Sequence, residues 1–173
     1  MERRKLLWAG ATAVAGAMTS NAMTSNALIS EAVAQNAAAA SLPDRFAAAL
    51  SARDIKAFAD LFAEDYVNHQ YSAAAPAPAA GKSQKQASVD FFAGRIAGMP
   101  DLQVAVETSV SSGDRVAASF VYTGTHEGTY FGVAPTHRKL RFTSCDIFLV
   151  KDGLLREHWG MGDIAGVLAQ LRA

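Results

Sequence analysis

The first half of the chain carries apolar residues at helical spacing. Each of three segments begins with a residue that can cap a helix, and each places apolar side chains on one face. The three predicted helices run from Ser41 with Phe46, Ala49 and Leu50 on the apolar face, from Ser51–Asp54 with Ile55, Phe58, Leu61 and Phe62, and over Ser83–Ala97 with Val89, Phe92 and Ile96. The second is expected to end near Asp65–His69, and Gly98–Met99–Pro100 stops the third.

The second half changes to a period of two, which is typical of strands. Apolar positions alternate with polar ones in the segments that begin at Leu102, Val116, Leu140 and Leu154. Turns are expected at Ser112–Asp114 and at Lys151–Gly153, and Asp163 is a candidate cap for a closing helix. Helices followed by an antiparallel meander indicate an α+β fold, in which N-terminal helices cover one face of a curved antiparallel sheet.

Asp146 interrupts this pattern. In the strand Leu140–Val150 the even positions form an apolar stripe, and Asp146 falls in phase with it. A carboxylate that faces a core or a cavity loses hydration, which raises its pKa and favours proton exchange near neutral pH. Asp146 is therefore the candidate general acid and base. The alternative is a buried aspartate that Ser144 satisfies, or that pairs with Arg156 or His158.

The turn at Lys151–Gly153 returns the chain close to Asp146. A two-residue turn would place Asp146 opposite Trp159, whereas a three-residue loop with a bulge would place it opposite His158. The pattern does not choose between these registers. His158 is thus a candidate partner of the acid, and Trp159 is a candidate wall for a flat ligand or a core anchor.

Other candidates depend on where the pocket opens. His69 follows the second predicted helix, where an imidazolium is favoured by the helix dipole or could contact a ligand carbonyl. His126 lies in a glycine-rich stretch and is a second candidate catalytic partner or a strand cap. Tyr66, Phe120 and Asp163 complete the expected substrate-binding residues.

Composition narrows the function. The chain has 173 residues, 50% hydrophobic, with a formal net charge of zero, which suits one globular domain. It lacks the basic footprint of nucleic-acid-binding proteins. The four histidines show no zinc-ligand spacing, so no metal is expected. The single cysteine, Cys145, cannot form an intramolecular disulfide and lacks a paired base in phase with it.

The first 34 residues read as an export signal. Arg3–Arg4 followed by Leu6–Leu7 and an Ala- and Gly-rich stretch resembles a twin-arginine signal peptide, and Ala32–Ala34 is the best cleavage site. An uncleaved anchor is the alternative. We expect a signal peptide over residues 1–34, a spacer over 35–40, a domain over 41–173, a periplasmic or secreted location, and no stable membrane span after cleavage.

Several motifs together resemble one family. They are Asp60–His69, Gly124–Gly128 with Phe131–Thr136, Asp146–Phe148, Asp152–Gly153, Glu157–Trp159, Asp163 and Gln170–Leu171. In this order they are similar to the SnoaL-like polyketide cyclases, also labelled ester cyclases, over about Phe46 to Leu171. His137 stands where a glycine usually follows Pro-Thr in the family.

The resemblance implies a ketosteroid-isomerase-like, nuclear-transport-factor-like α+β cone. It implies cofactor-free acid–base chemistry in which a pocket aspartate, matched here by Asp146, closes a ring by an intramolecular aldol reaction. We therefore expect an exported, homodimeric enzyme that cyclises, isomerises or hydrates a small hydrophobic carbonyl compound. The alternative is a periplasmic binding protein that uses the same pocket without catalysis, and a third possibility is a scaffold that dimerises through the outer face of the sheet.

Overall fold

The computed structural model describes residues 17–72 and 76–173, with side chains from residue 25 onward. The chain divides after Val33 into two units. In the first unit the described residues are helical, and the Arg3–Arg4 motif of the expected signal lies outside the described residues. The second unit, residues 34–173, contains the sheet and the candidate site.

Helix α1 (Ala17–Ala52) differs from the expectation at its start. The helix is continuous through residues 35–40 and through Ser41, so the predicted N-cap at Ser41 is wrong. The Ser41 hydroxyl instead donates to the carbonyl of Ala38, one turn earlier. Alanine has the highest helix propensity, so the alanine-rich run continues the helix rather than separating it from a leader.

The segment predicted as one helix after Ser51 contains two elements. Helix α2 (Ile55–Ala59) is short and is capped by Asp54, whose carboxylate accepts from the backbone N–H of Ala57. Strand β1 (Phe62–Asn68) then replaces the predicted end of the helix. Phe62 and Tyr66 are four residues apart, which places them on one face of either a helix or a strand, so the spacing alone could not separate the two.

The remaining elements follow the expected order. They are α3 (Gln84–Gly98), β2 (Gln103–Ser112), β3 (Arg115–Thr125), β4 (Lys139–Lys151), β5 (Leu154–Gly162) and α4 (Ile164–Arg172). The Ser83 hydroxyl caps α3 by accepting from Gln86 N–H, and Asp163 caps α4 by accepting from Gly166 N–H. The sequence analysis correctly placed the start of this third predicted helix at Ser83 and the cap of the closing helix at Asp163.

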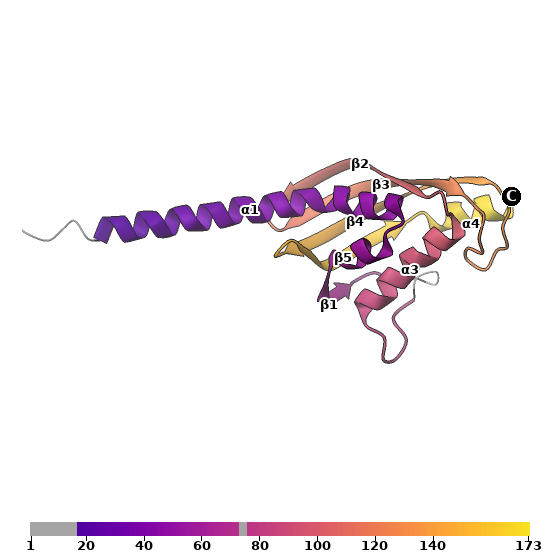
Figure 1. Ribbon diagram of the computed structural model, residues 1–173, viewed down its shortest axis with the longest axis horizontal. Coiled ribbons are helices and arrows are strands. Elements are labelled where there is room, and N and C mark those ends of the chain that lie inside the picture. The colour runs from indigo at the N-terminus through magenta and orange to yellow at the C-terminus, as the bar shows by residue number, and fades with distance from the viewer. Residues whose placement is uncertain (1–16, 73–75) are drawn as a thin grey trace, which may run out of the picture. The chain divides into compact units, whose positions relative to one another are not determined.

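The strands form one five-stranded sheet in the order β1-β5-β4-β3-β2. Every neighbouring pair is antiparallel except β1 with β5, which is parallel. Figure 1 shows the strands side by side in this order, with α3 across one face of the sheet. The fold is α+β, with helices packed on one face of a curved, open sheet, as the sequence predicted.

Aromatic residues fill the space between the helices and the sheet. The ring of Phe46 on α1 lies 4.9 Å from Phe58, 5.2 Å from Phe92, 5.1 Å from Phe120 and 5.7 Å from Phe148, measured between centroids. These five residues, the phenylalanine cluster, come from two helices besides α1 and from two strands. Edge-on and tilted ring pairs of this kind stabilise a core beyond their buried area.

Among the described residues, no helix is both long and apolar enough to cross a membrane.

Candidate active site

The β4–β5 hairpin decides which side chains reach Asp146. Asp152 and Gly153, both at positive φ, form a two-residue turn between the paired Lys151 and Leu154. The pairing then shifts, because Val150 faces Leu155 but Leu149 faces Glu157. Arg156 is therefore the extra residue of a β-bulge.

The bulge makes both predicted registers wrong. It advances β5 by one residue, so that Gly160 lies opposite Asp146, Trp159 opposite Ile147 and His158 opposite Phe148. His158 then shares the face of Asp146 as its diagonal neighbour. One contact from outside the hairpin and one from its turn hold the bulge, since the Arg156 guanidinium pairs with Asp65 of β1 and with Asp152.

Asp146 is buried and hydrogen-bonded on both oxygens. Its side chain is 8% exposed. His158 Nε2 lies 2.7 Å from Asp146 Oδ1, and Ser144 Oγ donates to Oδ2 at 2.6 Å. A buried carboxylate needs such donors. Two of the three partners that the sequence offered, Ser144 and His158, are thus both present, whereas Arg156 pairs with Asp65 and Asp152 instead.

His158 is fixed in orientation by two further contacts. Its Nδ1 lies 3.2 Å from the hydroxyl of Tyr66, which accepts from Ser88 Oγ at 3.3 Å. Its ring stacks on Phe148 with centroids 5.1 Å apart. Burial raises the pKa of Tyr66 well above its usual range, so its hydroxyl keeps its proton. A Tyr66 hydroxyl that donates to Nδ1 leaves Nε2–H of His158 to donate to Asp146.

Gly160 leaves the space in which this pair meets. A Cβ at Gly160 would lie 2.1 Å from Asp146 Oδ1 and 2.2 Å from His158 Nε2, closer than any side chain tolerates. The neighbouring Gly162 is different, since a Cβ there would meet nothing nearer than 3.8 Å. Gly160 is thus a part of the site that the sequence analysis missed. Its position opposite Asp146 could not be known without the register.

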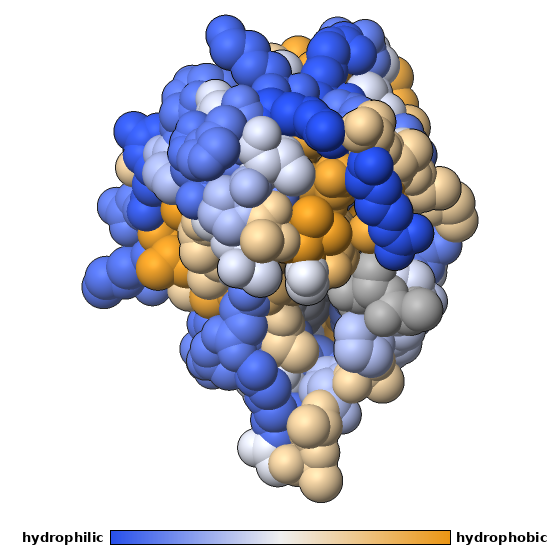
Figure 2. Space-filling model, turned by 90° about the vertical axis from the view of Figure 1, so that its right-hand side faces the viewer, coloured by the Kyte–Doolittle hydropathy of each residue, from blue (hydrophilic) through white to orange (hydrophobic). Residues whose placement is uncertain are grey.

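A cavity of about 680 Å³ opens beside the Asp146–His158 pair. This volume lies within the range of small-molecule sites. Its walls come from α3, from β3 to β5 and from the loop after β1; they include Ser88, Phe91, Phe92, Arg95, Tyr122 and Ser144. On the face in Figure 2, apolar residues are visible between hydrophilic ones.

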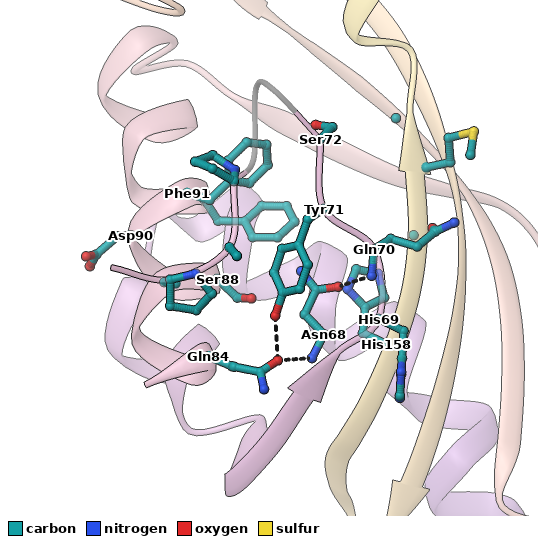
Figure 3. A pocket seen from close by; sticks show the side chains of 18 of the residues that line it. Asn68, His69, Gln70, Tyr71, Ser72, Gln84, Ser88, Asp90, Phe91 and His158 are labelled. Carbon is teal, nitrogen blue, oxygen red and sulfur yellow. Dashed lines mark hydrogen bonds between the residues drawn. The ribbon is translucent and has the colours of Figure 1, made fainter. Parts of the chain in front are cut away.

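The wall formed by the loop after β1 is tied to α3. Gln84 Oε1 accepts from the backbone N–H of Asn68 at 2.7 Å and from the hydroxyl of Tyr71 at 2.6 Å. Figure 3 shows these two bonds on one side of the cavity, together with Phe91 and Ser88 of α3. His69 also lines the cavity, but its Nε2 pairs with Glu157 at 2.6 Å.

Four expected site residues lie elsewhere. Trp159 is on the opposite face of β5 from His158, where its ring stacks on His69 with centroids 4.4 Å apart. Phe120 belongs to the phenylalanine cluster, and Asp163 caps α4. Buried His126 interacts through Nδ1 with Thr136, whose hydroxyl lies at 3.0 Å and whose N–H donates at 3.2 Å. None of the four lines the cavity beside Asp146. Tyr66, also expected to bind substrate, does not line it either and instead contacts His158 and Ser88.

Arg95 and Tyr122 were not expected at the site. Both are buried and line the cavity. The Tyr122 hydroxyl lies 3.4 Å from Ser144 Oγ, and burial raises the pKa of Tyr122 to about 12. The position of Arg95 could have been predicted from the sequence. It follows Ser88, Phe91 and Phe92 at helical spacing and so shares their face of α3.

A buried carboxylate and an imidazole at the wall of a small-molecule cavity, on an α+β curved sheet, define a candidate acid–base site. The family comparison agrees with this class. The model of the SnoaL-like polyketide cyclases matches residues 40–171, and the chain belongs to that family.

Solved structures show the same fold. IdmH from Streptomyces antibioticus, a proposed polyketide cyclase, is 29% identical, with a TM-score of 0.66 over 78% of this chain and 98% of its own. AclR from Streptomyces galilaeus, a proposed hydroxylase, is 25% identical, with a TM-score of 0.66 over 79% of this chain and 82% of its own. The search of curated proteins gave no match.

Proposed function

We propose that this protein is an enzyme that moves a proton next to the carbonyl group of a small hydrophobic molecule, with Asp146 as general base and acid. The observation that carries the proposal is the buried Asp146 carboxyl group, held by His158 and Ser144 at the wall of a cavity of about 680 Å³. Proton abstraction from carbon needs a positioned base in a pocket that excludes water.

The hydrogen bonds prepare Asp146 for this role. His158 and Ser144 each donate one hydrogen bond to a different oxygen, which leaves each oxygen a further lone pair. The chain of donors from Ser88 through Tyr66 to His158 holds the imidazole in one tautomer. His158 is thus a positioning residue, and Asp146 is the group that meets the substrate.

The reaction types that fit are cyclisation, isomerisation and hydration. In cyclisation and isomerisation, Asp146 takes a proton from the carbon next to a carbonyl and later returns a proton to the product. In hydration, Asp146 takes a proton from the attacking water and gives a proton to that carbon. Ring closure is supported by the family, because its members are named as polyketide cyclases.

Deuterium exchange tests the proposal before the substrate is known. Aryl ketones and 1,3-dicarbonyl compounds would be incubated with the protein in D2O, and loss of the α-proton followed by NMR. Wild type should accelerate exchange of at least one compound, and Asp146→Asn should reduce that rate by about 10²-fold or more, the usual contribution of a general base. Asp60→Asn, which removes an exposed carboxylate paired with Lys56, is the control and should retain the wild-type rate.

Two outcomes would contradict the assignment. If Asp146→Asn exchanges the proton within threefold of wild type, Asp146 is not the base. If compounds bind in the cavity, as shown by shifts of their NMR lines, but none exchanges with wild type, the protein is a small-molecule binding protein.

We also propose that the protein is exported, with residues 1–34 as a cleaved signal. The support is the Arg3–Arg4 motif and the small residues Ala32 and Ala34. Mass spectrometry of the periplasmic fraction should find a mature chain that begins at Gln35. Replacing both arginines by lysine should stop export if the route is twin-arginine, whereas an intact chain in the cytoplasm would contradict export by either route.

A further inference from the structure

Arg95 is a buried cation at the wall of the cavity. Its residue is 4% exposed. Its guanidinium carbon lies 4.4 Å from the ring centroid of Tyr122, 4.8 Å from Phe92, 5.1 Å from Phe142 and 5.2 Å from Phe91. Contacts of this kind favour a cation over an aromatic face, and they hold the guanidinium in one place.

The charge of Arg95 has no direct carboxylate partner in the part of the chain that the structure describes. Its Nε donates a hydrogen bond to the hydroxyl of Tyr130 at 3.1 Å. Removing a cation from water without an ion pair is costly. Such a charge at a cavity wall is a candidate functional group.

Arg95 and Asp146 belong to one connected set. The guanidinium lies over the ring of Tyr122, whose hydroxyl is 3.4 Å from Ser144 Oγ, and Ser144 donates to Asp146. Both charged residues line the same cavity. A ligand that spans the cavity from Ser144 to α3 can therefore contact both the carboxyl group and the guanidinium.

Proton abstraction moves a negative charge from Asp146 to the substrate. The Asp146 carboxylate takes the proton, the electron pair of the C–H bond becomes the C=C bond of an enolate, and the carbonyl π pair moves to its oxygen. One negative charge thus leaves Asp146 and appears on the substrate oxygen, while Arg95 keeps its proton. A preorganised cation in a site of low dielectric stabilises such a charge strongly.

We propose that Arg95 binds this enolate oxygen and thereby selects substrates whose acidic C–H is conjugated to a carbonyl oxygen that reaches the guanidinium. The inference rests on the proposed function. It assigns to Arg95 the role of binding the oxygen that carries the negative charge of the enolate.

The test uses 4-nitrophenol as a surrogate for the enolate, because its phenol and phenolate forms absorb at different wavelengths. Asp146→Asn reproduces the uncharged state that Asp146 has after taking the proton. This variant should bind the phenolate in preference to the phenol, and raise the bound phenolate-to-phenol ratio at least tenfold over the ratio in buffer at the same pH. Adding Arg95→Met should return that ratio to the value in buffer, and adding Arg95→Lys should retain part of the shift.

A matched control separates the site from general electrostatics. Arg115 lies 5.5 Å from the Trp159 ring, on the opposite face of β5 from His158, so Arg115→Met should leave the ratio unchanged. Folding is checked by thermal unfolding. Arg95→Met should melt at the same temperature as wild type or higher, since a buried charge is replaced by an aliphatic chain. A large fall would show that Arg95 is structural and would overturn the proposal.

The outcomes distinguish this inference from the proposed function. If the phenolate ratio persists in Asp146→Asn with Arg95→Met, Arg95 does not bind the anion, whatever deuterium exchange shows. If the ratio depends on Arg95 but wild type exchanges no α-proton, Arg95 is an anion site in a binding protein. As a single substitution, with Asp146 intact, Arg95→Met should also lower the rate of α-proton exchange by about 10²-fold, the contribution of one oxyanion donor.

Discussion

Phe148 and Asp146 are two residues apart on the same face of β4, but they belong to different environments. Phe148 is fully buried among the rings of Phe46 and Phe120. Asp146 meets Ser144, His158 and open space. The first region is closed by apolar rings, and the second places polar groups around a cavity.

The comparison shows that one strand, β4, contributes both to the stabilising core and to the candidate site. The phenylalanine cluster removes apolar surface from water and leaves no polar group to satisfy. The region around Asp146 buries a carboxylate, a guanidinium and two phenols, which contribute little net stability. His158 joins the two regions, since it stacks on Phe148 and donates to Asp146.

Breaking the apolar region should have the largest effect on stability. Phe46→Ala removes the ring at the centre of the phenylalanine cluster and should lower the free energy of unfolding by about 3–5 kcal/mol. Urea denaturation measures this loss. Val110→Ala, at a side chain that is 70% exposed, is the control and should change it by less than about 0.5 kcal/mol. A loss below about 1 kcal/mol for Phe46→Ala would contradict this account of the core.

Filling the space at Gly160 should come next. The new methyl group of Gly160→Ala would overlap Asp146 Oδ1 and His158 Nε2, so we expect a loss of about 1–3 kcal/mol together with loss of deuterium exchange. Gly162→Ala, where the methyl group has room, should unfold within about 0.5 kcal/mol of wild type. Equal losses in the two variants would show that the Asp146–His158 contact is not what Gly160 protects.

Removing the Tyr66 hydroxyl should weaken only the polar region. Tyr66→Phe keeps the ring against Phe62 and leaves His158 Nδ1 without its donor, at a cost of about 1 kcal/mol. Nitrogen NMR of the imidazole should show that His158 no longer holds a single tautomer. An unchanged spectrum would mean that Tyr66 does not set the tautomer.

Neutralising Asp146 should change stability least. In Asp146→Asn the amide oxygen still accepts from His158 and the amide N–H can donate to Ser144, so the free energy of unfolding should stay within about 1 kcal/mol of wild type. Chemical denaturation measures it. A loss of about 3 kcal/mol or more would indicate a structural ion pair with a buried cation.

The sequence predicted the order of the elements from α3 onward and the place of Asp146, because both depend on local periodicity. It could not predict which residue faces Asp146. That register depends on the bulge at Arg156, which is held by Asp65, far away in the chain. The segment Phe62–Asn68 was predicted as helix for a similar reason, since its strand conformation depends on pairing with β5, which is distant in sequence.

Only a part of the candidate site was predicted, because its other residues depend on the register of β5. Asp146 and His158 were named because they are chemically unusual in an apolar pattern. Trp159 and Phe120 were placed at the cavity because large aromatic side chains suit pocket walls, yet the register turns Trp159 to the other face and the core takes Phe120. Arg95 was overlooked because a charged residue on a helix is usually taken as solvent-exposed.

The parallel pairing of β1 with β5 has a consequence for how the chain folds. The strand made last, β5, lies between β1 and β4, so the sheet cannot be completed until nearly the whole chain has been synthesised. Pairing between strands so distant in sequence is slow, because the loop between them must close first. The β2–β3–β4 meander can form earlier. His158 and the bulge both belong to β5, so the contact between His158 and Asp146 cannot form before β5 pairs with β4.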